Sequence, residues 1–245
     1  MDQRQEELAT NLDRVHARIA EACTAAGRNA EDVTLITVTK FFPAADVERL
    51  AALGVSQMGE NREQEAGPKF AELSPSVRAA VRLHFIGQLQ TNKAGRVASY
   101  ADVVQSVDRA RLVRALDRGA AAALQAGDRQ TPLDVTLQVD LGQGADQGRG
   151  GALPEDVTTL ADLVVASESL RLRGLMAVAP RDLDADGIRA AFDRLATLSG
   201  ELGHTSPDAT WLSMGMSADL ELAVAAGATH LRVGTAILGS RPSAE

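Results

Sequence analysis

The sequence contains few aromatic residues and a single cysteine. Aromatic residues make up 3% of the 245 positions, with one Trp and one Tyr, so the core has to be built on Ala, Val and Leu. One cysteine excludes a disulfide within the chain. Cys23 falls on an apolar helical face with Leu8, Leu12, Val15 and Ile19, where we expect it to pack as an inert side chain.

Long apolar runs and an excess of positive charge are also missing. No apolar stretch is long enough to span a bilayer, and the polar amino terminus has no signal-peptide core. The net charge is −8, with acidic and basic residues interspersed, which argues against a nucleic-acid partner. No apolar stripe stands out beyond the helix faces that the fold needs. The sequence therefore predicts a cytoplasmic monomer that binds neither membranes nor nucleic acids.

Several chemical motifs are absent. The glycine-rich stretch 142–151, which we expect to be a loop, has neither the G-x-G-x-x-G fingerprint nor the Walker lysine. The four histidines are scattered, without carboxylate or cysteine partners at ligand spacing, so we expect no metal site. The G-x-S-x-G nucleophile elbow is also missing. These absences argue against the commonest nucleotide, metal and serine-nucleophile chemistries.

Lysine is scarce, which makes the position of one lysine informative. The chain has three lysines, Lys40, Lys69 and Lys93, against twenty-two arginines. Lys40 follows the apolar run Val33–Thr39, at the end of a predicted buried strand. A desolvated lysine can lose its proton and condense with a carbonyl to form a Schiff base, which arginine cannot do. The alternative is a snorkelling lysine whose head reaches water, and this position alone leaves both interpretations open.

Short β-branched runs alternate with Ala-rich helical segments, after an amphipathic helix over about residues 2–26. Eight β-α units in one chain indicate an α/β protein with a single (β/α)8 (TIM) barrel, and a doubly wound sheet is the alternative. No composition break marks a second domain, so residues 1–245 are predicted to form one domain, with the helix in residues 1–28 packed on it. The predicted strands are Val33–Thr39, Val55–Met58, Leu83–Ile86, Val103–Ser106, Leu133–Val139, Leu172–Val178, Thr210–Ser213 and His230–Val233.

Unusual polar residues fall in or just past the predicted strands. Lys40 follows the first strand and Asn61 the second, while His84 lies in the third. The carboxyl ends of barrel strands meet on one face, where active sites are built. Asn61 can hydrogen-bond a ligand or cap the following helix. His84 more often packs as a satisfied strand histidine, but we include it among the candidate ligand-binding residues.

The loops after the last two predicted strands have the composition of a phosphate site. Backbone N–H groups and hydroxyls in such loops can hold a phosphate, and these loops are its usual place in a barrel. Ser217 is expected to cap the helix Ala218–Ala226, which is its commoner role. A lysine across the barrel suggests pyridoxal 5′-phosphate (PLP), whose aldehyde and phosphate lie at opposite ends of its ring. The candidate phosphate-binding residues are Ser213, Gly215, Gly234 and Thr235.

Arg232 lies in an apolar strand, where a charged side chain is unusual unless it has a partner or a function. An inward-facing arginine could meet the pyridine nitrogen of PLP and keep it unprotonated. The ring is then a poorer electron sink than it would be with an aspartate partner. The alternative is a salt bridge at the end of the barrel.

Six ordered segments of the sequence carry a family resemblance. They are VTKFFP, MGENREQE, HFIGQLQTNK, QSVDR, GLMAVAP and LSMGMSADLELAVAAGATHLRVGTAILGSR. Together they resemble the pyridoxal-phosphate homeostasis proteins over about residues 30–241. The resemblance implies a PLP-binding barrel similar to the N-terminal domain of bacterial alanine racemase. Two departures, Phe41-Phe42 after the lysine and Leu83 before the HFIG segment, bring the shape of the cavity into question.

The same resemblance implies roles for individual residues. Lys40 would carry PLP as a Schiff base, Arg232 would face the pyridine nitrogen, and Asn61 would lie near the ring. The phosphate would be held by Ser213, Gly215, Gly234 and Thr235.

The sequence also bears on catalysis. A two-base racemase needs proton donors on both faces of its substrate, and in alanine racemases a C-terminal β-domain supplies the second as a tyrosine. We expect no such domain here, and Tyr100 is expected at the opposite end of the barrel from the site, which leaves His84 as a modest candidate. The leading hypothesis is a protein that carries or buffers PLP in vitamin B6 and amino-acid homeostasis, with apo PLP-dependent enzymes as candidate recipients. The alternatives are a weakly active PLP-dependent amino-acid racemase and a cofactor-free Schiff-base aldolase.

Overall fold

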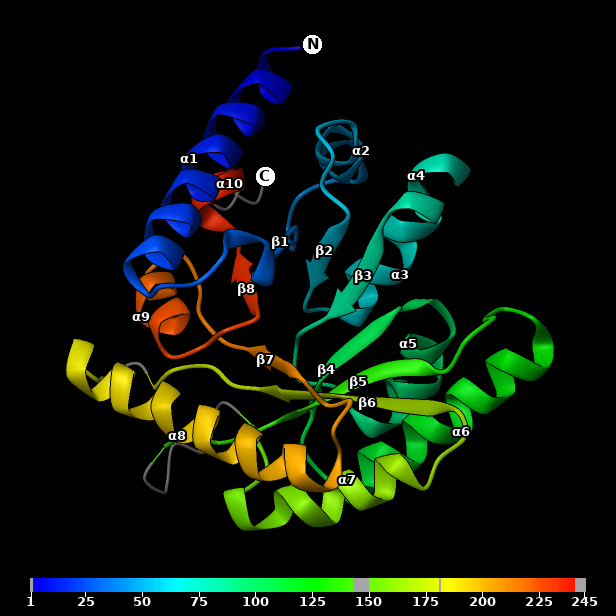
Figure 1. Ribbon diagram of the computed structural model, residues 1–245. Helices are drawn as coiled ribbons and strands as arrows, with labels where there is room; N and C mark the ends of the chain where they lie inside the picture. Colours follow the sequence, from blue (N-terminus) through cyan, green and yellow to red (C-terminus); the bar gives the residue numbers. More distant parts are fainter. Residues whose placement is uncertain (1, 143–149, 181, 241–245) are drawn as a thin grey trace.

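The computed structural model describes residues 2–142, 150–180 and 182–240. Eight parallel strands form a closed barrel, in the order β1 to β8, and helices surround it (Figure 1). The predicted (β/α)8 barrel with an additional N-terminal helix is confirmed. The strands are β1 (Thr34–Val38), β2 (Gln57–Glu60), β3 (Arg82–Phe85), β4 (Val103–Val107), β5 (Leu133–Gln138), β6 (Leu170–Met176), β7 (Trp211–Ser213) and β8 (His230–Val233).

The N-terminal helix α1 (Gln3–Ala25) lies outside the barrel beside α9 and α10 (Figure 1). The Asp2 carboxylate accepts a hydrogen bond from the Gln5 N–H at 2.8 Å and so caps the helix. Cys23 is buried in α1, as expected. The other helices are α2 (Ala44–Ala52), α3 (Glu63–Ala71), α4 (Pro75–Ala80), α5 (Ala94–Tyr100), α6 (Ala110–Ala126), α7 (Val157–Val165), α8 (Ala185–Thr205), α9 (Leu220–Ala225) and α10 (Thr235–Leu238), and short 3-10 turns occur at Ala30–Asp32, Thr91–Lys93 and Pro154–Asp156.

Several strand boundaries differ from the prediction. β2 continues through Gly59 and Glu60, which pair with His84 and Phe85 of β3. Glycine is needed there for close packing, because a Cβ on Gly59 would lie 3.1 Å from the Ile36 Cγ2. The prediction ended this strand at Met58, before Gly59, and that boundary was wrong. The predicted loop 142–151 follows β5, but residues 143–149 lie outside the described residues.

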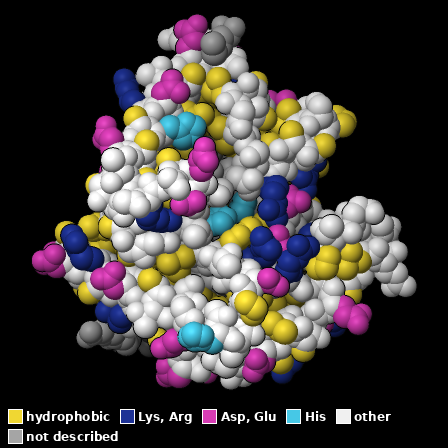
Figure 2. Space-filling model, viewed as in Figure 1, with side chains coloured by type: hydrophobic (Ala, Val, Ile, Leu, Met, Phe, Trp, Pro, Cys, Tyr) yellow, Lys and Arg dark blue, Asp and Glu magenta, His cyan; other side chains and the backbone are white. Residues whose placement is uncertain are grey.

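Aromatic and arginine side chains close the amino-terminal end of the barrel. Trp211 and His230 begin β7 and β8, and their ring centroids lie 4.2 Å apart. The Arg173 guanidinium carbon lies 4.6 Å from the Trp211 ring centroid, and Arg82 pairs with buried Asp134 at 2.7 Å. In the face seen in Figure 2, Lys and Arg side chains gather in the middle of the molecule, over β3 and β6. A ligand site within the barrel therefore belongs at its other end.

The helices are too short or too polar to cross a bilayer, as far as the described part of the chain goes.

Candidate functional site

A cavity of about 320 Å³ opens at the carboxyl ends of β1 and β8. This volume lies at the lower end of the usual range for small-molecule sites. Of the described side chains that line it, only two, Lys40 and Arg232, are ionisable. The lining residues are Val38, Lys40, Phe41, Phe42, Ile86, Met216, Ser217, Ala218, Arg232, Gly234, Thr235 and Gly239.

Lys40 is half-buried and follows β1 after one residue. Its Nζ lies 5.7 Å from the centroid of the Phe41 ring, and Arg62 approaches the same ring at 5.0 Å. Phe41 has a φ of 71°, a left-handed conformation that is rare for a bulky side chain and costs on the order of 1–3 kcal/mol. The chain turns sharply immediately after the lysine, and no sequence signal marked this turn.

A buried ion pair supports the backbone before Lys40. The Lys69 ammonium lies 2.6 Å from the Glu60 carboxylate and donates to the Thr39 carbonyl at 2.9 Å. The Thr39 hydroxyl donates to the same carboxylate at 2.6 Å. Burial raises the pKa of Glu60 above its ordinary value of 4.5, and Lys69 opposes this rise. Sequence reasoning missed this pair, because Lys69 lies nine residues after Glu60 on a helix outside the barrel.

Arg232 points into the barrel, as predicted, and is 4% exposed. It donates to the Ser213 hydroxyl at 2.7 Å and to the Ala177 carbonyl at 2.7 Å. These bonds use two of its five N–H groups. Burial lowers its pKa from 12.5 to about 10, and it forms no ion pair with any described residue. The alternative of a salt bridge at the end of the barrel is therefore not observed in that part of the chain.

The loops after β7 and β8, which line the cavity, contain unpaired backbone donors. Within the described residues, the backbone N–H groups of Ser217, Ala218 and Gly234 have no hydrogen-bond acceptor. The Thr235 hydroxyl lies beside the same cavity. Unpaired N–H groups from two adjacent loops suit an anion such as phosphate.

Ser217 belongs to the cavity lining, and the predicted cap was wrong. α9 begins at Leu220, two residues later than expected, and Asp219 stands at its N-cap position. The Asp219 carboxylate accepts from the Met216 N–H at 2.5 Å, before the helix, and makes no side-chain cap hydrogen bond to α9.

Ser213 and Gly215 lie beneath the cavity lining. The Ser213 hydroxyl is fully buried and contacts Arg232. Gly215 has a φ of 89°, and a Cβ there would lie 2.4 Å from the Ala223 Cβ. Its carbonyl accepts from the Arg232 N–H. Gly215 therefore allows α9 to pack closely on the segment after β7, and both residues hydrogen-bond Arg232.

Asn61 follows β2 and lines a neighbouring, polar cavity of about 510 Å³ together with Arg62 and Gln88. Its Oδ1 is buried and has no hydrogen-bond partner among the described residues. No side chain caps α3, so Asn61 does not have the capping role that the sequence left open. An unsatisfied buried carbonyl can accept a hydrogen bond from a ligand.

His84 and Tyr100 are not in the cavity lining. His84 is fully buried inside the barrel, 6.1 Å from Trp211 between ring centroids, and burial lowers its pKa well below 6.5. Tyr100 packs against Gly67 of α3, outside the barrel. Burial and the charge of Glu63 raise its pKa above 10. Its backbone leads into β4 at the amino-terminal end, as expected, but its side chain lies in the helical layer.

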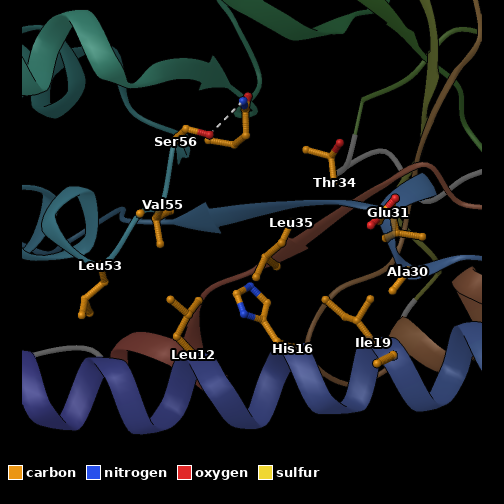
Figure 3. Close-up of a pocket in the computed structure, with 14 residues that line it drawn as sticks. Leu12, His16, Ile19, Ala30, Glu31, Thr34, Leu35, Leu53, Val55 and Ser56 are labelled. Carbon is orange, nitrogen blue, oxygen red and sulfur yellow. Dashed lines mark hydrogen bonds between the residues drawn. The ribbon is translucent and has the colours of Figure 1, made fainter.

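A larger cavity of about 620 Å³ lies between α1 and the starts of β1 and β2 (Figure 3). Leu12 and Ile19 point into it from α1, towards Leu35 of β1. No lysine or arginine is among the described residues that line it. Its described lining offers no lysine amine for a Schiff base, so the smaller cavity at Lys40 is the better candidate for PLP.

A family model described as alanine racemase, N-terminal domain, matches residues 7–242. The pyridoxal phosphate homeostasis protein of Mycobacterium tuberculosis (strain H37Rv) is 45% identical, over 97% of this chain and 94% of that protein. The protein of the same name from Pseudomonas aeruginosa is 41% identical, over 96% of both chains.

Solved structures match the barrel. An unknown protein from Bifidobacterium adolescentis has a TM-score of 0.86 and 32% identity, over 97% of each chain. PipY of Synechococcus elongatus, solved with PLP bound, has a TM-score of 0.78 and 34% identity, over 95% of this chain and 100% of its own. An alanine racemase of Clostridium difficile shares the fold, with a TM-score of 0.72 and 15% identity, over 97% of this chain and 58% of its own.

Proposed function

Because this chain belongs to the alanine racemase N-terminal domain family and, within it, to the pyridoxal phosphate homeostasis proteins, we propose that it binds PLP and carries or buffers it in vitamin B6 and amino-acid homeostasis. PLP supplies an aldehyde that condenses with amines and a ring that withdraws electrons from them. In this proposal Lys40 holds PLP as a Schiff base, and apo PLP-dependent enzymes receive it. A monomeric state and a cytoplasmic location are part of the same proposal, and light scattering and cell fractionation test them.

One observation carries the proposal: residues with an amine, a buried cation and unpaired N–H groups line the same cavity. Lys40 supplies the amine, and the loops after β7 and β8 supply donors for the phosphate. Arg232 can donate to the pyridine nitrogen, because it has N–H groups beyond those given to Ser213 and Ala177. The unpaired Asn61 Oδ1 in the adjoining cavity can accept from a ring hydroxyl.

Carriage is favoured over turnover because the cavity has few groups that exchange protons. Arg232, with a pKa of about 10, stays charged at neutral pH and is a poor proton donor. Lys40 is the other ionisable group of the lining in the described chain, and a two-base mechanism needs a partner on the opposite face. Tyr100 lies in the helical layer and His84 inside the barrel, so neither side chain lines the cavity.

Titration with PLP tests the binding. We expect the purified protein to be yellow and to show the absorption of a PLP Schiff base, and we expect Lys40→Ala to lose this absorption. Lys93→Ala is the comparison, because Lys93 does not line the Lys40 cavity. It lines the neighbouring cavity with Asn61 and pairs with Glu63 at 3.6 Å, so this variant should keep the Schiff-base absorption. A Lys40→Ala spectrum equal to that of the wild type contradicts the assignment. A colourless wild type that still forms a Schiff base with a carbonyl substrate favours the aldolase.

Two assays separate a carrier from a racemase. Mixing the PLP-loaded protein with an apo PLP-dependent enzyme should restore activity faster than the measured rate of free PLP release allows. A panel of amino acids should give turnover far below the roughly 1–10³ s⁻¹ of ordinary enzymes. Turnover in that range would refute the hypothesis that the protein only carries or buffers PLP.

A further inference from the structure

A chain of hydrogen bonds crosses the barrel interior beneath the cavity. It begins at Arg232 of β8, whose guanidinium donates to the Ser213 hydroxyl of β7 at 2.7 Å. Ser213 in turn donates to the Gln105 Oε1 of β4 at 2.7 Å. The Gln105 Nε2 and the His84 Nδ1 of β3 lie 2.9 Å apart, and the His84 Nε2 lies 2.8 Å from the Gln57 Oε1 of β2.

The partners fix the direction of every bond in the chain. The Gln105 amide nitrogen only donates, so the His84 Nδ1 must accept. The Gln57 carbonyl oxygen only accepts, so the His84 Nε2 must carry the proton. His84 is therefore neutral in one defined tautomer, and its low pKa agrees with this. All the donors point away from Arg232, and each acceptor faces back towards it.

This direction compensates a buried charge that no ion pair neutralises and that the Asp219 carboxylate offsets only at longer range. Arg232 is 4% exposed and has no ion-pair partner among the residues described. A buried cation is costly unless it is hydrogen-bonded, and aligned hydrogen bonds strengthen one another. The Ser213 hydroxyl presents its oxygen to Arg232 only while its proton is held by Gln105. Gln105 accepts that proton only while its other end donates to His84.

We propose that Gln105 and His84 are positioning residues, which orient the Ser213 hydroxyl and thereby hold the Arg232 guanidinium against the pyridine nitrogen of bound PLP. The inference rests on the proposed function, and it gives His84 a role other than contact with the cofactor. Neither residue touches PLP, and both act through Arg232. Residues of five strands form this series of hydrogen bonds, so the closed barrel itself fixes the position of the Arg232 guanidinium.

Substitution of Gln105 tests the role. Gln105→Met keeps the size of the side chain but leaves Ser213 without its acceptor. We expect PLP to bind about tenfold more weakly, which corresponds to the loss of one hydrogen bond to a charged network. We also expect a shifted pH midpoint in the absorption of the bound PLP. Ser106→Ala is the matched control, because Ser106 is the next residue of β4 and its buried hydroxyl has no partner in the described chain.

A pair of His84 substitutions separates positioning from packing. His84→Leu removes the acceptor and should behave like Gln105→Met. His84→Asn offers an amide oxygen near the position of Nδ1 and should bind PLP within about twofold of the wild type. PLP affinity and absorption equal to wild type in Gln105→Met and His84→Leu would overturn the proposal. So would an equal loss in Ser106→Ala.

Nitrogen NMR of the wild type, without PLP, tests the chain even if these variants fail to fold. At pH 7 the His84 ring should be neutral, with its proton on Nε2. A proton on Nδ1, whether or not Nε2 also carries one, would reverse the bond to Gln105 and overturn the proposal. Failure of the proposed function looks different, because then the wild type itself shows no Schiff-base absorption.

Discussion

At the scale of single residues, the buried pair between Lys69 and Glu60 matters most for the geometry of the cavity. Lys69 holds the Thr39 carbonyl, one residue before Lys40, and the Thr39 hydroxyl is bound to Glu60. The lysine that is proposed to react is therefore attached to a backbone that a second lysine fixes. Removing one partner of such a pair leaves the other charge buried and uncompensated.

Lys69→Met is expected to lower the free energy of unfolding by about 3 kcal/mol, because Glu60 then lacks its cation. Urea unfolding measures this. Lys93→Met is the control, since Lys93 is 26% exposed and its pair with Glu63 spans 3.6 Å. We expect a change below about 1 kcal/mol there. Equal stability of Lys69→Met and the wild type would contradict the structural role of the pair.

Single-residue roles were only partly predictable from sequence. Lys40 and Arg232 stood out because each interrupts or ends an apolar strand, and both line one cavity. Ser213 and His84 were assigned to cofactor contact, but both lie beneath the cavity, where they contact other side chains. Their hydrogen-bond partner, Gln105, looked unremarkable because a glutamine in a strand has no pattern of its own. Such contacts depend on strands far apart in the chain.

At the scale of elements, the strand ends and the loops that follow them shape the site. The turn after β3 passes very close to the loop after β2. A Cβ on Gly87 would lie 2.0 Å from the Asn61 carbonyl oxygen, which no rotamer can relieve, since both groups are backbone. Glycine at this position therefore sets the distance between the two loops.

Gly87→Ala is expected to displace the loop at Asn61, lowering the free energy of unfolding by about 2 kcal/mol, a typical cost of overpacking. PLP affinity should fall with it. Gly95→Ala provides the control, because Gly95 lies in α5 and an added Cβ there would have no heavy atom within 4 Å. Alanine there should be neutral or stabilising by up to about 1 kcal/mol. Gly87→Ala matching wild type in both measurements would show that the close contact has no importance.

Element boundaries show why local signals are insufficient. The alternation of β-branched and Ala-rich runs predicted eight strands in the correct order. β2 nevertheless extends past Gly59, and α9 begins after Ser217, because packing against neighbouring elements decides both ends. A glycine or a serine is an ordinary stop or cap signal, and neither marks a boundary here.

At the scale of the whole molecule, the barrel has one closed and one open end. Its closed end contains Trp211 and two buried histidines, His84 and His230. Burial lowers the pKa of His230 from 6.5 to about 4, and nearby Arg173 adds to the effect. Both histidines are neutral in the folded barrel at pH 7, but their unfolded forms bind protons below about pH 6.5.

The stability of the barrel should therefore fall in acid. A histidine with a lowered folded pKa contributes fully above its unfolded pKa, and this stability is lost as the pH falls from about 6.5 towards 4. Between pH 7.5 and pH 5, His230 alone should account for about 2 kcal/mol. Glu60 acts in the opposite sense, because its raised pKa favours the folded state at low pH.

Comparison with His230→Phe isolates this contribution, because Glu60 is unchanged in both proteins. The loss of unfolding free energy between pH 7.5 and pH 5, measured in urea, should be about 2 kcal/mol smaller in the variant. Equal losses in the two proteins would mean that His230 titrates normally.

The central claim is that Lys40 holds PLP, and borohydride reduction tests it most directly. Reduction of the PLP-loaded protein fixes the cofactor covalently on its amine, and mass spectrometry of the peptides locates it among three lysines. We predict modification of the peptide that contains Lys40, and none in Lys40→Ala. Modification of Lys69 or Lys93 in the wild type, or undiminished labelling of Lys40→Ala, would contradict the account.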